Sequence, residues 1–130
     1  MKHKSLIAVV DDDQSVREAL ENLISSVGFE VQLFASAEDF LDSDTLSQVD
    51  CAILDVRLPG ISGLELQQQL AANGKSIPVI IITAQGDDKT QDQAVAAGAI
   101  AFLKKPVKEE VLLAALESAL TRNAGEQVAR

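Results

Sequence analysis

The sequence predicts an α/β domain built on a five-stranded, doubly wound parallel sheet. Apolar segments of strand length alternate with helical patterns five times along 130 residues, and parallel strands need such helical crossovers. Right-handed crossovers then place helices on both faces of the sheet. The clearest strand is 51–55, where four residues that can be buried run into an aspartate. A continuous apolar run bounded by turn residues is typical of a buried parallel strand.

The first three predicted elements are a strand at 5–10, a helix at 16–27 and a strand at 31–34. Gly28 follows the helix, at a position where glycine commonly ends helices. The strand at 31–34 is less apolar than the others, which favours a place at the edge of the sheet. The residues of the first helix that are expected to face the core recur at steps of three and four: Val16, Ala19, Leu20, Leu23, Ile24 and Val27.

Two more helices are predicted on either side of the central strand. Ser36, with Asp39 three residues later, forms a variant of the capping box and predicts the start of a short helix. Residues 62–72 predict a helix with Leu66 and Leu70 on its apolar face.

The second half of the chain continues the alternation. A strand is predicted at 79–82 and ends at Thr83. A weaker helix follows at 87–97 and is stopped by Gly98, and the fifth strand is predicted at 99–103.

The last helix is expected at 108–120. Residues 121–130 lose the apolar period, so we expect the domain to span 1–120 and the rest to be a C-terminal tail or a linker stub. The residues of the last helix that are expected to face the core are Val111, Leu112, Ala115, Leu116 and Ala119.

Composition excludes several classes of protein. A single cysteine rules out a disulfide framework, and no apolar run is long enough to cross a membrane. The N-terminus lacks a signal-peptide pattern, so we expect a cytoplasmic protein with no membrane contact. A net charge of −9 argues against nucleic-acid binding by this domain, because phosphate contacts need clustered basic residues.

Polar residues stand at the ends of four predicted strands: Asp11 and Asp12, Asp55, Thr83 and Lys105. The carboxyl ends of parallel strands lie at one edge of a sheet, so these side chains are expected to meet there. Crowded carboxylates repel one another unless a cation intervenes, and Mg²⁺ prefers hard oxygen ligands. The sequence therefore predicts a site in which Asp55 attacks a phosphoryl group as a nucleophile while Mg²⁺ and Lys105 neutralise the phosphoryl oxygens.

Each signal also has an ordinary structural explanation. An aspartate at a strand end commonly caps a turn, and Asp11 to Asp13 would suit the positive end of a helix dipole. Thr83 could be structural, and Lys105 could be a solvated surface charge. Only the combination of the four strand ends points to one reaction.

The motifs resemble those of the receiver domain of two-component response regulators, the CheY-like family. The resemblance covers residues 5 to about 120 and implies a flavodoxin-like (βα)5 fold with strand order 2-1-3-4-5. It implies a protein that accepts a phosphoryl group from a sensor histidine kinase with Mg²⁺ or Mn²⁺, and that catalyses only its own phosphorylation and dephosphorylation. The motifs that carry it are Val9-Val10-Asp11-Asp12, Leu54-Asp55-Val56-Arg57-Leu58-Pro59-Gly60, Thr83-Ala84 and Lys105-Pro106.

The resemblance implies a role for each matching acidic residue. Asp55 matches the phosphoacceptor, and Asp12 and Asp55 match the direct metal ligands. Asp11 matches the second acid of the pair, which lies close to the metal or contacts it through water. Arg57 matches the position whose backbone carbonyl binds the metal.

The resemblance also implies which residues sense the phosphoryl group. Thr83 and Lys105 match the hydroxyl and the lysine that contact it, and the small Ala84 leaves room for it. Lys105 is preferred to the adjacent Lys104 because it precedes a proline, as in the family motif. Phe102 matches the switch aromatic, although it could also simply fill the core.

Arg57 and Gln85 match the variable positions that tune the lifetime of the phosphoryl group in the family. The residues themselves leave the direction open, since a long arginine could obstruct water and Gln85 could either orient or exclude it.

The run from Asp55 to Gln67 looks most like the FixJ group, transcription regulators with a C-terminal helix-turn-helix domain. These 130 residues hold no such domain, so we expect regulation of transcription through a separate DNA-binding domain, or else a stand-alone receiver that acts through protein contacts. The resemblance further implies a homodimer that forms on phosphorylation, through the helix at 87–97, the strand at 99–103 and the last helix.

Three other classes are less compatible with the residues. A hydrolase with an aspartyl-phosphate intermediate would need a second acid two positions after the nucleophile, where Arg57 stands. A flavin-binding module would need a Gly- and Ser/Thr-rich phosphate loop, whereas Asp11 to Asp13 would repel the flavin phosphate. A degenerate receiver would lack a chemical position, and all five are present.

Overall fold

The structure is a computed structural model that describes residues 4–74, 77–84 and 88–128. Within these residues, five parallel strands form one sheet in the order β2-β1-β3-β4-β5, which confirms the predicted fold class. The strands are β1 (Leu6–Val10), β2 (Glu30–Phe34), β3 (Cys51–Asp55), β4 (Val79–Thr83) and β5 (Ala101–Lys104).

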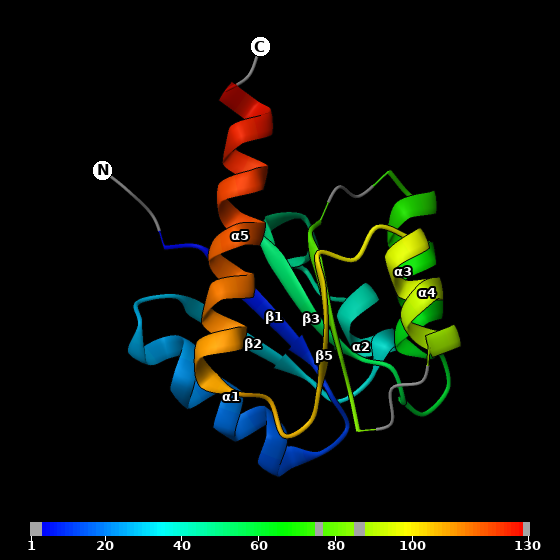
Figure 1. Cartoon of the computed structure of the whole chain (residues 1–130). Coiled ribbons are helices and arrows are strands. Elements are labelled where there is room, and N and C mark those ends of the chain that lie inside the picture. Colours follow the sequence, from blue (N-terminus) through cyan, green and yellow to red (C-terminus); the bar gives the residue numbers. More distant parts are fainter. Residues whose placement is uncertain (1–3, 75–76, 85–87, 129–130) are drawn as a thin grey trace.

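Helices cover both faces of the sheet, with α1 and α5 on one side and α2, α3 and α4 on the other (Figure 1). A short 3₁₀ turn at Leu46–Gln48 precedes β3. Asp87, the predicted first residue of the fourth helix, lies outside the described residues. The helices are α1 (Gln14–Ser26), α2 (Ala37–Leu41), α3 (Gly63–Ala72), α4 (Asp88–Ala96) and α5 (Glu109–Val128).

The sheet separates two apolar cores. Strands β1, β3 and β4 are buried along their whole length, because both of their faces are covered by helices. Alternate residues of β3 serve the two cores: Ile53 packs with α1 and α5, and Leu54 packs with α2, α3 and α4. The interior strands are therefore fixed from both sides, and their carboxyl ends are rigid supports for polar side chains.

The edge strands differ from the interior ones. Strand β2 is at the edge, as predicted, and is only partly buried. Strand β5 begins two residues later than predicted, because the N–H of Ala99 is used to close the end of α4 through a bond to the carbonyl of Ala94.

Serine caps begin two of the helices. The hydroxyl of Ser36 accepts the N–H of Asp39 at the start of α2. The full reciprocal capping box occurs instead at α3, where the Ser62 hydroxyl accepts the N–H of Glu65 and the Glu65 carboxylate accepts the N–H of Ser62. Aspartate is one methylene shorter than glutamate, which favours the complete box at Glu65.

Three residues that were expected to face the core lie at the surface instead. Val27 is 48% exposed, Val111 is 44% exposed, and Ala19 is also exposed. Each stands at the margin of its apolar stripe, and a helix on a sheet buries only the residues that point at the sheet. Val27 is in addition the C-cap of α1, where the chain leaves the helix.

The last helix is longer than predicted. It continues to Val128, whereas the sequence was interpreted as a helix to residue 120 followed by a linker or frayed end. Residues 121–128 contain no proline and several strong helix formers, so the helix can propagate. The loss of an apolar period predicts loss of burial and not the end of a helix. Figure 1 shows this end of α5 projecting beyond the rest of the domain.

Among the described residues, none of the helices combines the length and the apolar character needed to cross a bilayer.

Candidate functional site

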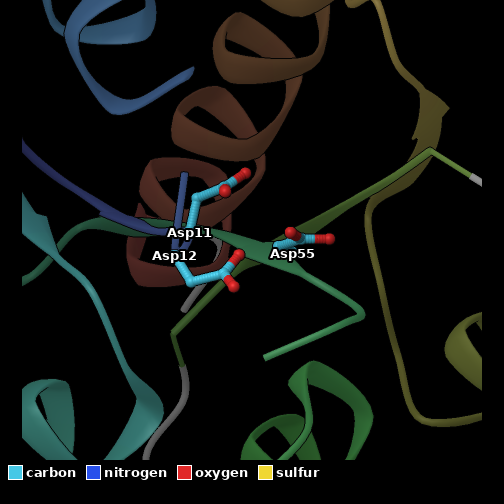
Figure 2. A group of neighbouring side chains, drawn as sticks. All are labelled: Asp11, Asp12 and Asp55. Carbon is cyan, nitrogen blue, oxygen red and sulfur yellow. The ribbon is translucent and has the colours of Figure 1, made fainter. Parts of the chain in front are cut away.

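Three aspartates gather at the carboxyl edge of the sheet. Val10 of β1 pairs with Leu54 of β3, so the next residues of the two strands, Asp11 and Asp55, stand side by side. Asp11, Asp12 and Asp55 each offer a carboxylate oxygen within 4.8 Å of the others (Figure 2). Asp11 and Asp55 are buried and Asp12 is exposed, so the cluster opens to solvent on the side of Asp12.

Lys105 supplies the positive charge that contacts this cluster. Its Nζ lies 2.9 Å from Asp11 Oδ2 in an ion pair, and it donates a hydrogen bond of 3.1 Å to Asp55 Oδ2. The backbone N–H of Lys105 donates to the carbonyl of Thr83 at 2.8 Å, which continues the ladder between β4 and β5 by one residue. Lys105 thus reaches across the end of β4, whereas Lys104 is exposed on β5.

Two residues that follow Asp11 in the chain, Asp13 and Arg17, hold it in place. The N–H of Asp13 donates to Asp11 Oδ1 at 2.9 Å, and Arg17 Nη1 donates to the carbonyl of Asp11 at 2.8 Å. Asp13 in turn caps α1 by accepting the N–H groups of Ser15 and Val16. The hydrogen bond from the Ser15 hydroxyl is the main reason that the pKa of Asp13 is lowered. Asp13 therefore serves the helix start, as one of the ordinary explanations had it, while Asp11 faces the site.

Asp55 is held from the other side by the loop that leads to α3. The N–H of Arg57 donates to Asp55 Oδ1 at 3.2 Å, and the N–H of Gly63 donates to the carbonyl of Val56 at 3.0 Å. A Cβ atom added at Gly63 would clash with the backbone oxygen of Asp55. The first turn of α3 therefore rests directly on the backbone of Asp55, and only glycine permits that approach.

Burial and the neighbouring charges shift two pKa values in the site. Burial raises the pKa of Asp55, and the charge of Asp11 adds to that increase, while the hydrogen bond from Lys105 works against it. Burial alone would lower the pKa of Lys105, but its contacts with Asp11 and Asp55 outweigh burial and raise it. Lys105 is therefore held firmly as an ammonium, and Asp55 gives up its proton less readily than an exposed aspartate.

The remaining residues predicted for the site occupy varied positions. Thr83 is buried at the end of β4, and Ala84 follows it at the surface. Phe102 on β5 is half-buried and packs against the core on the side of α2, α3 and α4. Gln85 lies outside the described residues. The roles suggested for Thr83, Ala84 and Phe102, and for the carbonyl of Arg57, stay predictions.

Sequence reasoning missed two residues that shape the site, Arg17 and Gly63. A signal for Gly63 was available, since glycine at the start of a helix is unfavourable unless the backbone must pass close to another group. Arg17 had no such signal, because an arginine on a surface helix is ordinary.

The donor set suits a hard divalent cation. Three carboxyl groups lie together, and the Lys105 ammonium contacts two of them, Asp11 and Asp55, so the acidic groups outnumber the basic group that contacts them. Carboxylate oxygens are the ligands that Mg²⁺ prefers, and the exposed Asp12 leaves space for coordinated water. The residues present therefore fit Mg²⁺ or Mn²⁺.

Comparison with known protein families agrees with the resemblance seen in the sequence motifs. The family model described as the response regulator receiver domain matches residues 7–117 of this chain. The response regulator protein TodT of Pseudomonas putida is 46% identical over 116 residues, which are 89% of this chain and 51% of TodT. The transcriptional regulatory protein FixJ of Bradyrhizobium diazoefficiens is 39% identical over 120 residues, which are 92% of this chain and 58% of FixJ. The chain thus spans little more than half the length of these relatives.

Solved structures agree with these matches. The response regulator StyR superposes with a TM-score of 0.89 at 49% identity, over 98% of this chain and 65% of that one. The structure of FixJ-N superposes with a TM-score of 0.81 at 34% identity, over 92% of this chain and 96% of that one.

The contact between Gly63 and Asp55 predicts whether Gly63→Ala raises or lowers the free energy of unfolding. In an open helical position, replacing glycine by alanine stabilises a protein by about 0.5–1 kcal/mol. At Gly63 the new methyl group meets the backbone of Asp55, so Gly63→Ala should instead lower the free energy of unfolding by about 1–3 kcal/mol. Urea denaturation followed by circular dichroism measures it. A variant as stable as the wild type, or more stable, would contradict the described packing.

Proposed function

The chain belongs to the response regulator receiver domain family, and on that premise we propose that Asp55 is the residue that accepts the phosphoryl group. The chain is the receiver domain of a two-component regulator and not a conventional enzyme. The observation that carries the assignment is the cluster of Asp11, Asp12 and Asp55 with Lys105 in contact. Asp55 alone among the three is itself the last residue of an interior strand, since Asp11 and Asp12 follow the end of β1.

The proposed reaction is an in-line transfer from a phosphohistidine of a sensor kinase, the donor that a receiver domain implies. An Asp55 carboxylate oxygen attacks phosphorus, the bond from phosphorus to the histidine nitrogen breaks, and an acyl phosphate forms. Bound Mg²⁺ would neutralise negative charge on the phosphoryl oxygens. We assign Asp12 and Asp55 as its carboxylate ligands, the carbonyl of Arg57 as a backbone ligand, and Asp11 as a neighbour that contacts it directly or through water.

Lys105 and Thr83 are proposed to sense the product. Lys105 Nζ already contacts Asp55 Oδ2, so it needs little movement to pair with the oxygens of a phosphoryl group attached there. Thr83 ends the strand next to β3 and would donate its hydroxyl to the same group. We propose that Ala84 leaves the space and that Phe102 turns further inward as the loop after β4 is drawn in. Arg57 and Gln85 are proposed to set how long the acyl phosphate survives.

The output is proposed to be regulation of transcription through a DNA-binding domain beyond the receiver. FixJ carries the name of a transcriptional regulatory protein and is longer than the part this chain matches. We propose residues 1–120 as the receiver and 121–130 as the connection to such a domain. Because α5 continues as a helix to Val128, the connection would begin as a helical extension of the receiver.

We propose a surface for self-association on α4, β5 and α5. Val95 on α4 is 58% exposed and Val111 on α5 is 44% exposed, and both are large apolar side chains. A groove of about 360 Å³ beside Val111 is lined in part by Phe102. The proposed switch residue thus borders exposed apolar surface on α5, which would let a movement of Phe102 change the proposed interface.

Charge on this face favours a second copy of the chain as the occupant. Asp88 and Asp92 are exposed on α4, and Lys104 and Lys108 are exposed at the end of β5 and before α5. Lys89 is also exposed on α4, and Glu109 and Glu110 are exposed at the start of α5. Both signs of charge therefore stand on both elements, and in a two-fold arrangement the aspartates of one copy can meet the lysines of the other. The net charge of −9 opposes association, and phosphorylation adds further negative charge. The dimer would therefore depend on a rearrangement of this face and not on a change in net charge.

The test of the proposed function is phosphorylation by acetyl phosphate with Mg²⁺, followed by mass spectrometry. The wild type should gain the mass of one phosphoryl group, and Asp55→Asn should gain none. Asp50→Asn is the matched control, because Asp50 lies next to the other end of β3, where it accepts the N–H of Leu6. It should be modified like the wild type.

The metal is tested in the same assay. Chelation of Mg²⁺, or the substitution Asp12→Asn, should lower the rate by about tenfold or more, because the phosphoryl oxygens then lose a compensating charge. Modification that persists in Asp55→Asn would refute the assignment of the phosphoacceptor. Modification at full rate without a divalent cation would refute the role of the metal.

The dimer is tested by light scattering with and without beryllofluoride, a mimic of the phosphoryl group. The wild type should become dimeric only in its presence, and Val95→Glu should stay monomeric because it places a charge in the apolar contact. Val27→Glu is the control, since Val27 is a similarly exposed valine at the C-cap of α1, outside the elements of the proposed surface. A wild type that remains monomeric, or two variants that behave alike, would rule out this surface.

A further inference from the structure

Gln67 is a buried amide in the apolar face of α3. Its side chain is on the same face as Gly63, Leu66 and Leu70, and the residue is only 3% exposed. Its Nε2 donates a hydrogen bond of 3.1 Å to the backbone carbonyl of Ala94, 27 residues away in α4. Its Oε1 atom is buried and accepts no hydrogen bond from the described residues. A buried amide that bonds on one side only calls for a physical reason.

The partner of Gln67 is the point at which α4 attaches to the domain. Ala94 is the one side chain of α4 that is fully buried, and Val95 next to it is largely exposed. The carbonyl of Ala94 accepts two hydrogen bonds, one from Gln67 and one from the N–H of Ala99 that closes the end of the helix. The buried methyl group of Ala94 and the side-chain amide of Gln67 therefore both hold this end of α4. The exposed residues of α4 are Asp88, Lys89, Gln91, Asp92, Gln93, Val95 and Ala96.

Helix α3 connects that attachment to the candidate phosphoacceptor. Gly63, one helical turn before Gln67, rests on the backbone oxygen of Asp55. The same face of one short helix thus contacts Asp55 at its start and α4 one turn later.

We propose that the bond from Gln67 to the Ala94 carbonyl, here named the α3–α4 latch, holds the C-terminal end of α4 in the unphosphorylated protein and sets how readily α4 responds to Asp55. The inference rests on the proposed phosphorylation of Asp55 and extends it to a positioning residue. The orphan Oε1 opposes what the Nε2 bond gains, because a buried acceptor without a partner carries a desolvation cost. The latch is therefore weak enough to release when the site changes.

The first test compares Gln67→Met with the wild type by amide hydrogen exchange, without any phosphoryl mimic. Methionine keeps the length and volume of glutamine and removes the donor. Exchange in α4 should accelerate about two- to fivefold, the lower part of the range for one net hydrogen bond, because the substitution also removes the orphan Oε1. Exchange in β1, β3 and β4 should not change. The matched control is Gln69→Met, because Gln69 is an exposed glutamine on the same helix and should leave α4 unaffected.

The second readout is the apparent affinity for beryllofluoride. Loss of the latch should tighten it severalfold in Gln67→Met and not in Gln69→Met, because the unphosphorylated arrangement of α4 is no longer favoured by that bond. If Gln67 only filled space in the core, its replacement would not change the apparent affinity for beryllofluoride. Unaltered α4 exchange and affinity, equal effects in both variants, or faster exchange through all the strands would overturn the latch.

Magnetic resonance of the wild type keeps the idea testable if Gln67→Met fails to fold. The side-chain NH₂ of Gln67 should exchange slowly with solvent in the free protein and faster after beryllofluoride is added. An NH₂ group with the same exchange rate in both states would overturn the latch. The hydrogen-exchange measurements on the free protein do not depend on Asp55. If the protein were never phosphorylated, the proposed function would fail, but the α3–α4 latch could still be confirmed.

Discussion

The mutual repulsion of three carboxylates at one edge of the sheet is the constraint on which this structure depends. Asp55 ends the interior strand β3, and Asp11 directly follows the neighbouring interior strand β1; both residues are buried, so water screens their carboxylates poorly from each other. Lys105 offsets part of the repulsion by reaching past the end of β4 to both. An arrangement that costs stability is kept in place by the rest of the fold, which is the usual mark of a functional site.

The two apolar cores provide that restraint. Strands β1 and β3 are covered on both faces, so their ends cannot move apart to relieve the charges. The Arg17 side chain holds the carbonyl of Asp11, and Gly63 lies against the backbone of Asp55. In contrast, α4 has a single buried side chain, the fewest among the five described α-helices. The domain thus combines a rigid site with a loosely attached helix, and α3 contacts both.

Much of this could be predicted from the sequence, because burial leaves a strong pattern. The apolar runs of β1, β3 and β4 predicted strands, and the parallel arrangement placed Asp11, Asp55 and Lys105, which stand at strand ends, at one edge of the sheet. What could not be predicted depends on packing between elements. Nothing in the sequence distinguishes the buried Gln67 from the exposed Gln69 beside it, and only the packed helix shows which one faces α4. The continuation of α5 was missed for a related reason, since periodicity reports burial rather than helicity.

The most direct test of the central claim is a Mg²⁺ titration of the unphosphorylated protein, followed residue by residue by nuclear magnetic resonance. If the excess negative charge at the sheet edge is a cation site, backbone signals should shift at Asp11, Asp12 and residues 55–57, and Mg²⁺ should raise the thermal unfolding temperature. Asp12→Asn should weaken both effects. Signals that do not move at these residues, or that move only at acidic groups elsewhere on the surface, would contradict the account.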